Sequence, residues 1–252
     1  MSDNAINPNW PAPANVRSVI STRGGGFSTG PYQGNNLALH VADDGDVVVR
    51  NRQHFGRVEG LPEAVQWLEQ IHGAKVVEAQ DDCLVRTADG CVTSQPKLAC
   101  AVMTADCLPV LMCDRQGSQV AAVHAGWRGL AAGVLTNAVK RFTCSPEDIL
   151  VYLGPAIGQS YFEVGIDVLE VFYEQAQTAA QLDQITKAFQ PSIHKPMRFH
   201  ADIYQLAKAE LNTSGVTGIY GGDYCTYLEQ QRFYSYRRDG VTGRMAAFIW
   251  LS

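Results

Sequence analysis

Hydrophobic runs in the middle of the chain predict three short, buried strands. Residues 98–103, 109–113 and 119–123 carry almost no charge, and continuous apolar runs of this length are typical of strands covered on both faces. Turn-forming residues separate them at 104–106 and 114–117. We therefore expect the core of the protein to be a sheet built around these strands.

The flanking sequence predicts further strands and several amphipathic helices. Short apolar runs on either side of the central strands indicate further strands at 16–22, 65–71, 150–153 and 245–251. Apolar residues at helical spacing predict helices at 46–58, 129–142, 166–177, 181–189 and 201–212. Strands and helices mix without strict alternation, which favours an α/β or α+β layered fold over a barrel. No linker-like stretch divides the chain, so we expect one domain over residues 1–252.

Composition and charge narrow the class of protein. The 252 residues are 46% hydrophobic and 18% charged, as in an ordinary globular protein. The net charge is −5 and no lysine/arginine run exceeds two residues, so nucleic-acid binding is not expected. No apolar stretch is long enough for a membrane span and the start of the chain lacks a secretory pattern, so we expect a cytoplasmic protein.

The seven cysteines form no disulfide framework. Their number is odd and their spacing is not that of a small disulfide-rich scaffold. In a reducing compartment they are core residues or metal ligands. Four of them are expected as ordinary core or surface residues: Cys83, Cys91, Cys100 and Cys113.

Three residues form a candidate metal site. His72, Cys107 and His124 each stand where a predicted strand ends or a turn begins, and Gly73 and Gly126 leave room near the imidazoles. Imidazole and thiolate are the usual ligands of zinc, and three protein ligands leave the open fourth position of a catalytic site. Taken singly, each residue also has a plainer interpretation as a core or strand-end residue, so spacing alone leaves the matter open.

Longer motifs run through nearly the whole chain. They lie at residues 21–25, 36–37, 51–52, 88–93, 104–110, 124–130, 154–157 and 233–240. Together they resemble the YfiH-like family of purine nucleoside phosphorylases, long labelled multicopper polyphenol oxidases. The resemblance implies a single layered domain with a central β-sandwich flanked by helices. It also implies that His72, Cys107 and His124 bind zinc, with copper left open at the same ligands.

The resemblance further implies a reaction and its substrates. Phosphorolysis of adenosine, inosine, guanosine or methylthioadenosine would give the free base and ribose 1-phosphate, and adenosine would also be deaminated. A zinc ion with an open position suits deamination, because it makes a nucleophile of bound water. Purine nucleosides and phosphate are thus the expected partners, and the oligomeric state is not predicted.

Candidate residues for these substrates follow from their chemistry. The planar fork of arginine matches phosphate, which favours Arg23 in the glycine-rich loop, then Arg128 beside His124 and Arg237 or Arg238 near the end of the chain. Each of these arginines has a structural ion pair as its plainer interpretation.

Other residues of the motifs have two interpretations each. Asn36 could hold a ribose hydroxyl or cap a turn. Asp106 could assist Cys107 and His124 in catalysis, by proton transfer or by orienting a ligand, and a structural role is the simpler expectation. Tyr234 and Tyr236 could stack on a base or only pack.

Several alternatives remain. Copper with an axial methionine, Met103 or Met112, would give a polyphenol oxidase, although six histidines are too few for a multicopper laccase. Cys107 and His124 could instead form the nucleophile–base pair of a hydrolase, provided no metal binds the thiolate.

The residues do not separate these chemistries further. Family members are also linked to editing of peptidoglycan precursors, and nothing in the sequence distinguishes that role from the purine one. The His-x-Glu and Pro-Cys-x-x-Cys pattern of zinc nucleobase deaminases is absent. A non-catalytic binding module is the least favoured reading, because an open metal site is seldom only structural.

Overall fold

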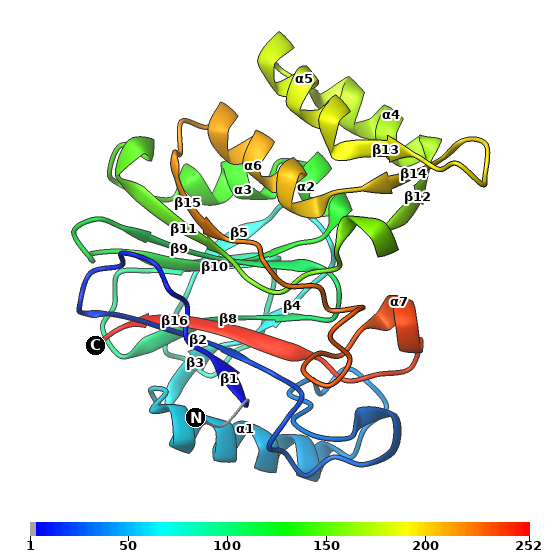
Figure 1. Cartoon of the computed structure of the whole chain (residues 1–252). Coiled ribbons are helices and arrows are strands. Elements are labelled where there is room, and N and C mark those ends of the chain that lie inside the picture. Colours follow the sequence, from blue (N-terminus) through cyan, green and yellow to red (C-terminus); the bar gives the residue numbers. More distant parts are fainter. Residues whose placement is uncertain (1–3) are drawn as a thin grey trace.

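Two stacked β-sheets form the centre of the protein, and helices cover both outer faces (Figure 1). The computed structural model describes residues 4–252. One sheet has the order β1 (Ala5–Ile6), β2 (Val16–Ser21), β16 (Met245–Leu251), β8 (Leu98–Thr104), β3 (Ala64–Gln66). The other has the order β15 (Gly218–Gly221), β11 (Ile149–Leu153), β9 (Leu108–Asp114), β10 (Val120–Ala125), β7 (Gly90–Thr93), β5 (Val76–Glu78).

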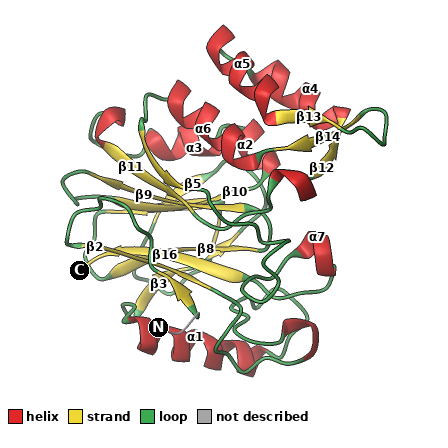
Figure 2. Cartoon of the chain, viewed as in Figure 1, coloured by secondary structure: helices red, strands yellow, loops and turns green. Residues whose placement is uncertain are grey.

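The helices are divided between the two outer faces (Figure 2). The long helix α1 (Gly45–Glu59) covers the five-stranded sheet, and α2 (Trp127–Ala131), α3 (Val134–Val139) and α6 (Ile203–Thr213) cover the six-stranded sheet. Beyond them lie α4 (Ile166–Gln175), α5 (Ala179–Ala188) and a small sheet of β12 (Glu163–Gly165), β14 (Arg198–Ala201) and β13 (Phe189–Pro191).

The remaining elements are short. They are the paired strands β4 (Leu68–Glu69) and β6 (Arg86–Thr87), the helix α7 (Tyr236–Asp239), and 3-10 turns at Gly30–Tyr32, Pro146–Asp148 and Gln159–Tyr161. Within residues 4–252, none of the helices combines the length and the apolar character needed to cross a bilayer.

Alternating side chains of the central strands fill three separate apolar layers. In β9, Val110 and Met112 pack toward the helices, whereas Leu111 and Cys113 pack between the sheets. In β8, the even-numbered residues 98, 100 and 102 face the other sheet and the odd-numbered residues 99, 101 and 103 pack toward α1. A strand with both faces buried needs apolar residues at every position, which accounts for the continuous hydrophobic runs.

The predicted fold class is confirmed, as a mixed α/β sandwich flanked by helices. The strands predicted at 16–22, 98–103, 109–113, 119–123 and 150–153 agree with β2, β8, β9, β10 and β11 to within two residues, and 245–251 coincides with β16. The helix at 46–58 is α1, and those at 166–177, 181–189 and 201–212 are α4, α5 and α6 with shifted ends.

Two elements were predicted wrongly. The single helix at 129–142 is two short helices, because Gly133 takes a φ of 82° that interrupts the helical path. The strand at 65–71 ends at Gln66, whose side chain donates to the Trp67 and Leu84 carbonyls, and the chain then forms the separate strand β4. Cys83 is exposed and Cys91, Cys100 and Cys113 are buried, as expected of ordinary surface and core residues.

Candidate metal centre and substrate cavity

Three segments far apart in sequence bring His72, Cys107 and His124 together. Cys107 lies in the turn between β8 and β9, His124 lies near the end of β10, and His72 lies in a turn after β4. One ligand atom from each residue falls within 4.8 Å of the other two. The two imidazole rings are nearly perpendicular, with centroids 4.8 Å apart. Among residues 4–252 this is the one such group of His, Cys, Asp and Glu.

Strand pairing explains how two of these residues meet. β9 and β10 are antiparallel, with Ala125 opposite Leu108. Cys107 directly precedes Leu108, so its thiol reaches the edge of the sheet where His124 stands. A Cβ on Gly126 would lie only 3.0 Å from the Cys107 sulfur and 3.3 Å from Cδ2 of His72. Glycine is therefore needed here to leave room for the cluster.

A buried carboxylate, Asp89, holds both histidines. Its Oδ1 lies 2.9 Å from Nδ1 of His124 and accepts the backbone N–H of His72 at 2.9 Å, while Oδ2 accepts the N–H of Gly73 at 2.7 Å. The bond to Nδ1 leaves Nε2 of His124 as the nitrogen available to a metal, the usual carboxylate–histidine–metal arrangement. In the sequence, Asp89 lies within the motif at 88–93, where no local pattern sets it apart from a turn residue.

The protonation states of the cluster favour metal binding. Burial would raise the pKa of the Cys107 thiol, but the charge of His124 and hydrogen bonds from His124 and His72 lower it to about 6. Burial opposes ionisation of Asp89 as well, yet the hydrogen bonds from His124 and Gly73 lower the pKa of this carboxyl. Because thiolate is the form that binds metals, Cys107 is prepared for a cation at neutral pH. Burial lowers the pKa of His124, but the charge of Cys107 and the hydrogen bond to Asp89 raise it to about 9, so this imidazole gives up a proton when a metal binds.

The cluster opens onto a cavity of about 560 Å³. Small-molecule sites usually have volumes of roughly 300–1,000 Å³. Apolar and aromatic side chains form much of its wall, and polar groups gather around the cluster. Besides the cluster, the wall includes His40, Gln70, Met103, Asp106, Trp127, Arg128, Ile157, Phe162, Ile203, Tyr236, Arg237 and Arg244.

Two of the predicted substrate residues lie at this cavity. The guanidinium of Arg128 lies over the ring of Trp127, 4.4 Å from its centroid. Arg237 donates to the carbonyl of Glu163 at 3.0 Å and lies 5.5 Å from the ring of Phe162. Both arginines therefore stand beside aromatic rings of the wall.

Asp106 also borders the cavity, but its oxygens are already engaged. Oδ1 accepts the hydroxyl of Thr226 at 2.6 Å, and Oδ2 accepts the backbone N–H of Arg237 at 2.7 Å. These bonds hold the start of α7, which carries Arg237, against the turn before Cys107. The geometry is that of a residue that positions the wall.

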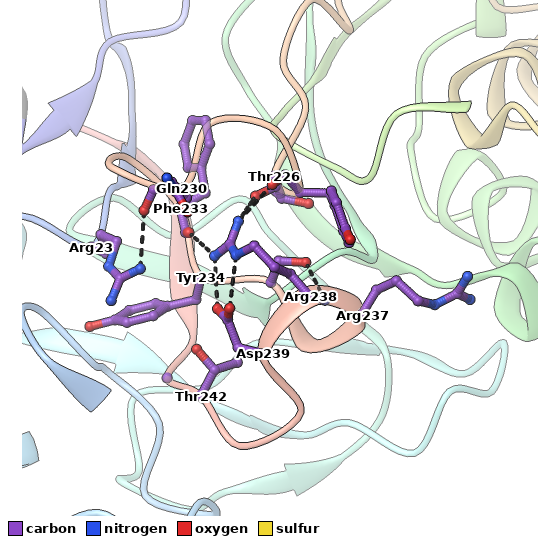
Figure 3. Close-up of polar contacts among 12 residues, drawn as sticks. Arg23, Thr226, Gln230, Phe233, Tyr234, Arg237, Arg238, Asp239 and Thr242 are labelled. Atoms are coloured by element: carbon purple, nitrogen blue, oxygen red, sulfur yellow. Dashed lines mark hydrogen bonds and ion pairs between the residues drawn. The ribbon is translucent and has the colours of Figure 1, made fainter. Parts of the chain in front are cut away.

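Arg23 and Asn36 lie outside the cavity. Arg23 donates to the Gln230 carbonyl at 3.0 Å and lies over the Tyr234 ring (Figure 3). A separate surface depression beside it is bordered by the glycine loop. Asn36 is fully buried. Its Oδ1 accepts the backbone N–H groups of Ala38 and Arg244, so it ties two loops together.

The neighbours of Arg23 are equally structural. Arg238 donates to the carbonyls of Thr226 and Phe233 and pairs with Asp239, pointing away from Arg237 (Figure 3). The buried hydroxyl of Tyr234 donates to the carbonyl of Tyr32. Tyr236, in contrast, is exposed at the cavity.

Of the two methionines proposed as axial copper ligands, only one lies at the cavity. Met103 borders the cavity, whereas Met112 packs in the apolar layer under the helices and cannot serve as an axial ligand. Residues that sequence analysis did not propose also line the cavity, chiefly His40 and Arg244. Neither stands in a recognisable local motif, and only the fold brings them beside the cluster.

The chain is similar to known proteins over nearly its whole length. The family model described as multi-copper polyphenol oxidoreductase laccase matches residues 17–252. A Pseudomonas aeruginosa protein named purine nucleoside phosphorylase is 48% identical over 98% of both chains, and so is the purine nucleoside phosphorylase YfiH of Escherichia coli.

Solved structures give the same result. A Neisseria meningitidis protein superimposes with a TM-score of 0.92 at 49% identity, covering 99% of each chain. YlmD from Geobacillus stearothermophilus superimposes with a TM-score of 0.85 at 31% identity, covering 94% of this chain and 92% of its own. The chain belongs to the YfiH family, whose family model bears the laccase description.

Proposed function

We propose that the protein is a zinc-dependent purine nucleoside phosphorylase. The observation that carries the proposal is the cluster of His72, Cys107 and His124, with ligand atoms within 4.8 Å, on the wall of a cavity large enough for a small-molecule substrate. The names of the relatives supply the reaction class.

The donor set fits zinc. Two imidazoles and a thiolate are ligands that zinc accepts readily, and three protein ligands are typical of catalytic zinc. Asp89 fixes the ring of His124 for this purpose. A zinc ion held here would supply Lewis acidity to an oxygen atom in the cavity.

The wall of the cavity suits a nucleoside. Trp127, Phe162 and Tyr236 offer aromatic surface against which a purine can stack. Arg128 and Arg237 add hydrogen-bond donors beside these rings. In the reaction a phosphate oxygen bonds to C1′ of the ribose as the bond from C1′ to the base breaks, and the base leaves with the electron pair and takes up a proton.

Asp106 acts through Arg237 and not on substrate. Its carboxylate holds the Arg237 backbone, so its contribution is to the shape of the wall. Cys107 and His124 act as ligands here, because a thiolate bound to metal is no longer free as a nucleophile.

Polyphenol oxidation by several copper ions is a poorer fit to these residues. Of the six histidines, only His72 and His124 belong to the cluster, and Met112 is buried elsewhere. One copper ion at the three ligands would still compete with zinc. Deamination of adenosine stays a prediction, checked by release of ammonia and inosine.

The test combines metal content with product analysis. Protein purified without added metal is examined by mass spectrometry and incubated with inosine, with and without phosphate. We expect about one zinc per chain and hypoxanthine only when phosphate is present. His72→Ala should lose both, whereas His54→Ala, on the exposed face of α1, should lose neither.

Other outcomes identify the alternatives. Copper in place of zinc would overturn the choice of metal. Zinc without base release would favour editing of peptidoglycan precursors. Absence of metal together with a reactive Cys107 would favour a cysteine hydrolase.

A further inference from the structure

A second pair of nitrogen-bearing side chains borders the cavity, apart from the three ligands. Arg244 and His40 both line it. Burial lowers the pKa of His40, and the charges of Arg244 and Arg52 lower it further. Arg244 is also close enough to Cys107 for the two charges to interact. The cavity thus has a cationic guanidinium, Arg244, and an imidazole held toward its neutral form, His40, next to the candidate metal centre.

No carboxylate neutralises Arg244. Within residues 4–252 the guanidinium forms no ion pair. Its Nη1 donates to the carbonyls of Thr242 and Gly243 at 2.9 and 3.0 Å, which fixes the plane of the group. After burial, which lowers the pKa of Arg244, the charges of Cys107 and then Asp106 act on it, but both oxygens of Asp106 accept from other groups.

Arg52, like Arg244, is half-buried, and it forms no ion pair in the described part of the chain. Its Nε donates to the Leu37 carbonyl at 2.8 Å, and its guanidinium stacks 3.6 Å above the ring of Trp67. These contacts hold Arg52 away from direct ligand binding and leave its charge in place. Arg52 therefore adds to the positive potential around His40.

Buried charges in proteins are normally paired, because an isolated charge loses its hydration without compensation. Arg244 has no carboxylate in an ion pair with it; its protein contacts are the two carbonyls and the ring of Tyr236, 5.8 Å away. Because the guanidinium also faces the cavity, we expect a ligand anion to be its ionic partner. Its planar fork offers parallel N–H donors that match the oxygens of phosphate.

The backbone of Arg244 is held in place from behind. Asn36 accepts its N–H at 2.9 Å, and the Arg244 carbonyl accepts the N–H of Leu37 at 3.2 Å. The segment that carries His40 is therefore tied to the start of β16, where Arg244 lies. A site organised in this way binds a ligand with little loss of side-chain freedom.

We propose that Arg244 and His40 form the subsite for the phosphate co-substrate, with Asn36 as a positioning residue. The inference rests on the proposed function, because it names the phosphate position within that same cavity. It replaces the sequence-based expectation of Arg23 for this role.

The test measures phosphate binding and turnover separately. Titration calorimetry of the metal-loaded protein with inorganic phosphate gives a Kd without nucleoside, and steady-state assays give KM for phosphate and for inosine. The variants are Arg244→Met, Arg244→Lys and His40→Gln, with Arg141→Met as the matched control on the exposed surface. Thermal unfolding of each variant checks that it folds.

We expect Arg244→Met to raise both the phosphate Kd and the phosphate KM by about tenfold or more, the usual cost of losing a charged hydrogen bond. The KM for inosine should change by less than about twofold on the same scale. Arg244→Lys and His40→Gln should have smaller effects in the same direction, and Arg141→Met none. If Arg244→Met does not fold, the lysine and His40 variants decide.

Other results overturn the inference or the function separately. Unchanged phosphate binding in the Arg244 and His40 variants, or acetate binding as tightly as phosphate, would overturn the phosphate subsite. Phosphate binding that depends on Arg244 without any cleavage of inosine would leave the subsite standing and overturn the proposed function.

Discussion

The buried carboxylate of Asp89 lies 2.9 Å from Nδ1 of His124 and so fixes which imidazole nitrogen faces Cys107 and His72. The same oxygen accepts the backbone N–H of His72. One side chain thus orients two of the three candidate ligands, and it comes from a segment that supplies none of them.

Replacing this carboxylate should weaken metal binding without removing a ligand. We expect Asp89→Asn to lower zinc affinity about 10- to 100-fold, as is usual when the partner of a ligating histidine is lost. Competition with a chromophoric chelator measures the change. Asp183→Asn, in an exposed ion pair of α5, is the control. Equal affinity in Asp89→Asn and the wild type would contradict the role given to Asp89.

Metal should protect Cys107 from alkylation. The pKa of this thiol is lowered to about 6, despite burial, by His124 and His72, so the metal-free protein holds it as thiolate at pH 7. Iodoacetamide should modify Cys107 after chelator treatment and leave it intact once zinc is restored. Peptide mass spectrometry in a Cys83→Ser background, which lacks the exposed thiol, checks this. Equal labelling with and without zinc would speak against Cys107 as a ligand.

Replacement of Asn36 should lower the stability of the folded protein. Its amide joins Asp43 to the backbone of Ala38 and Arg244. We expect Asn36→Ala to lower the free energy of unfolding by about 3 kcal/mol, because buried polar partners lose their hydrogen bonds. Urea unfolding measures the loss, with the exposed Asn212→Ala as control. A variant as stable as the wild type would contradict this assignment.

Glu210 should make stability depend on pH. Burial raises its pKa from 4.5 to about 7, although hydrogen bonds from Thr136 oppose the shift. Between pH 4.5 and about pH 7, the Glu210 carboxyl is ionised in the unfolded chain but stays protonated in the native protein. The contribution of Glu210 to stability is therefore greatest below pH 4.5, falls by about 3 kcal/mol as the pH rises to about 7, and is level above that.

The measurement compares denaturant unfolding from pH 4.5 to pH 8 in wild type and variants. Glu210→Gln should lack this part of the slope, whereas Glu174→Gln, on the exposed side of α4, should keep it. A wild-type slope that survives in Glu210→Gln would show that other groups cause it.

Sequence patterns were most informative where one physical requirement dominates. The strands β8 and β9 need apolar residues at every position because both faces are buried, and their runs are correspondingly plain. The helix break at Gly133 was missed because apolar spacing continues through it, and only a positive φ separates α2 from α3.

The sequence likewise predicted some residues of the candidate site and missed others. The motifs and the resemblance they carry led to His72, Cys107 and His124, which the fold brings together. Arg23 stands in an equally suggestive glycine-rich loop, yet that loop folds against the Gln230 carbonyl. No local sequence motif marks Arg244. Its proposed role follows from a guanidinium that faces the cavity without a carboxylate in an ion pair, and only the folded structure shows this.

Direct observation of the products tests the central claim most simply. Phosphorus NMR of the zinc-loaded protein with inosine and phosphate should show ribose 1-phosphate in amounts equal to the hypoxanthine released, and neither should form with His72→Ala. Hypoxanthine with free ribose, or no hypoxanthine from protein that holds zinc, would contradict the assignment as a purine nucleoside phosphorylase.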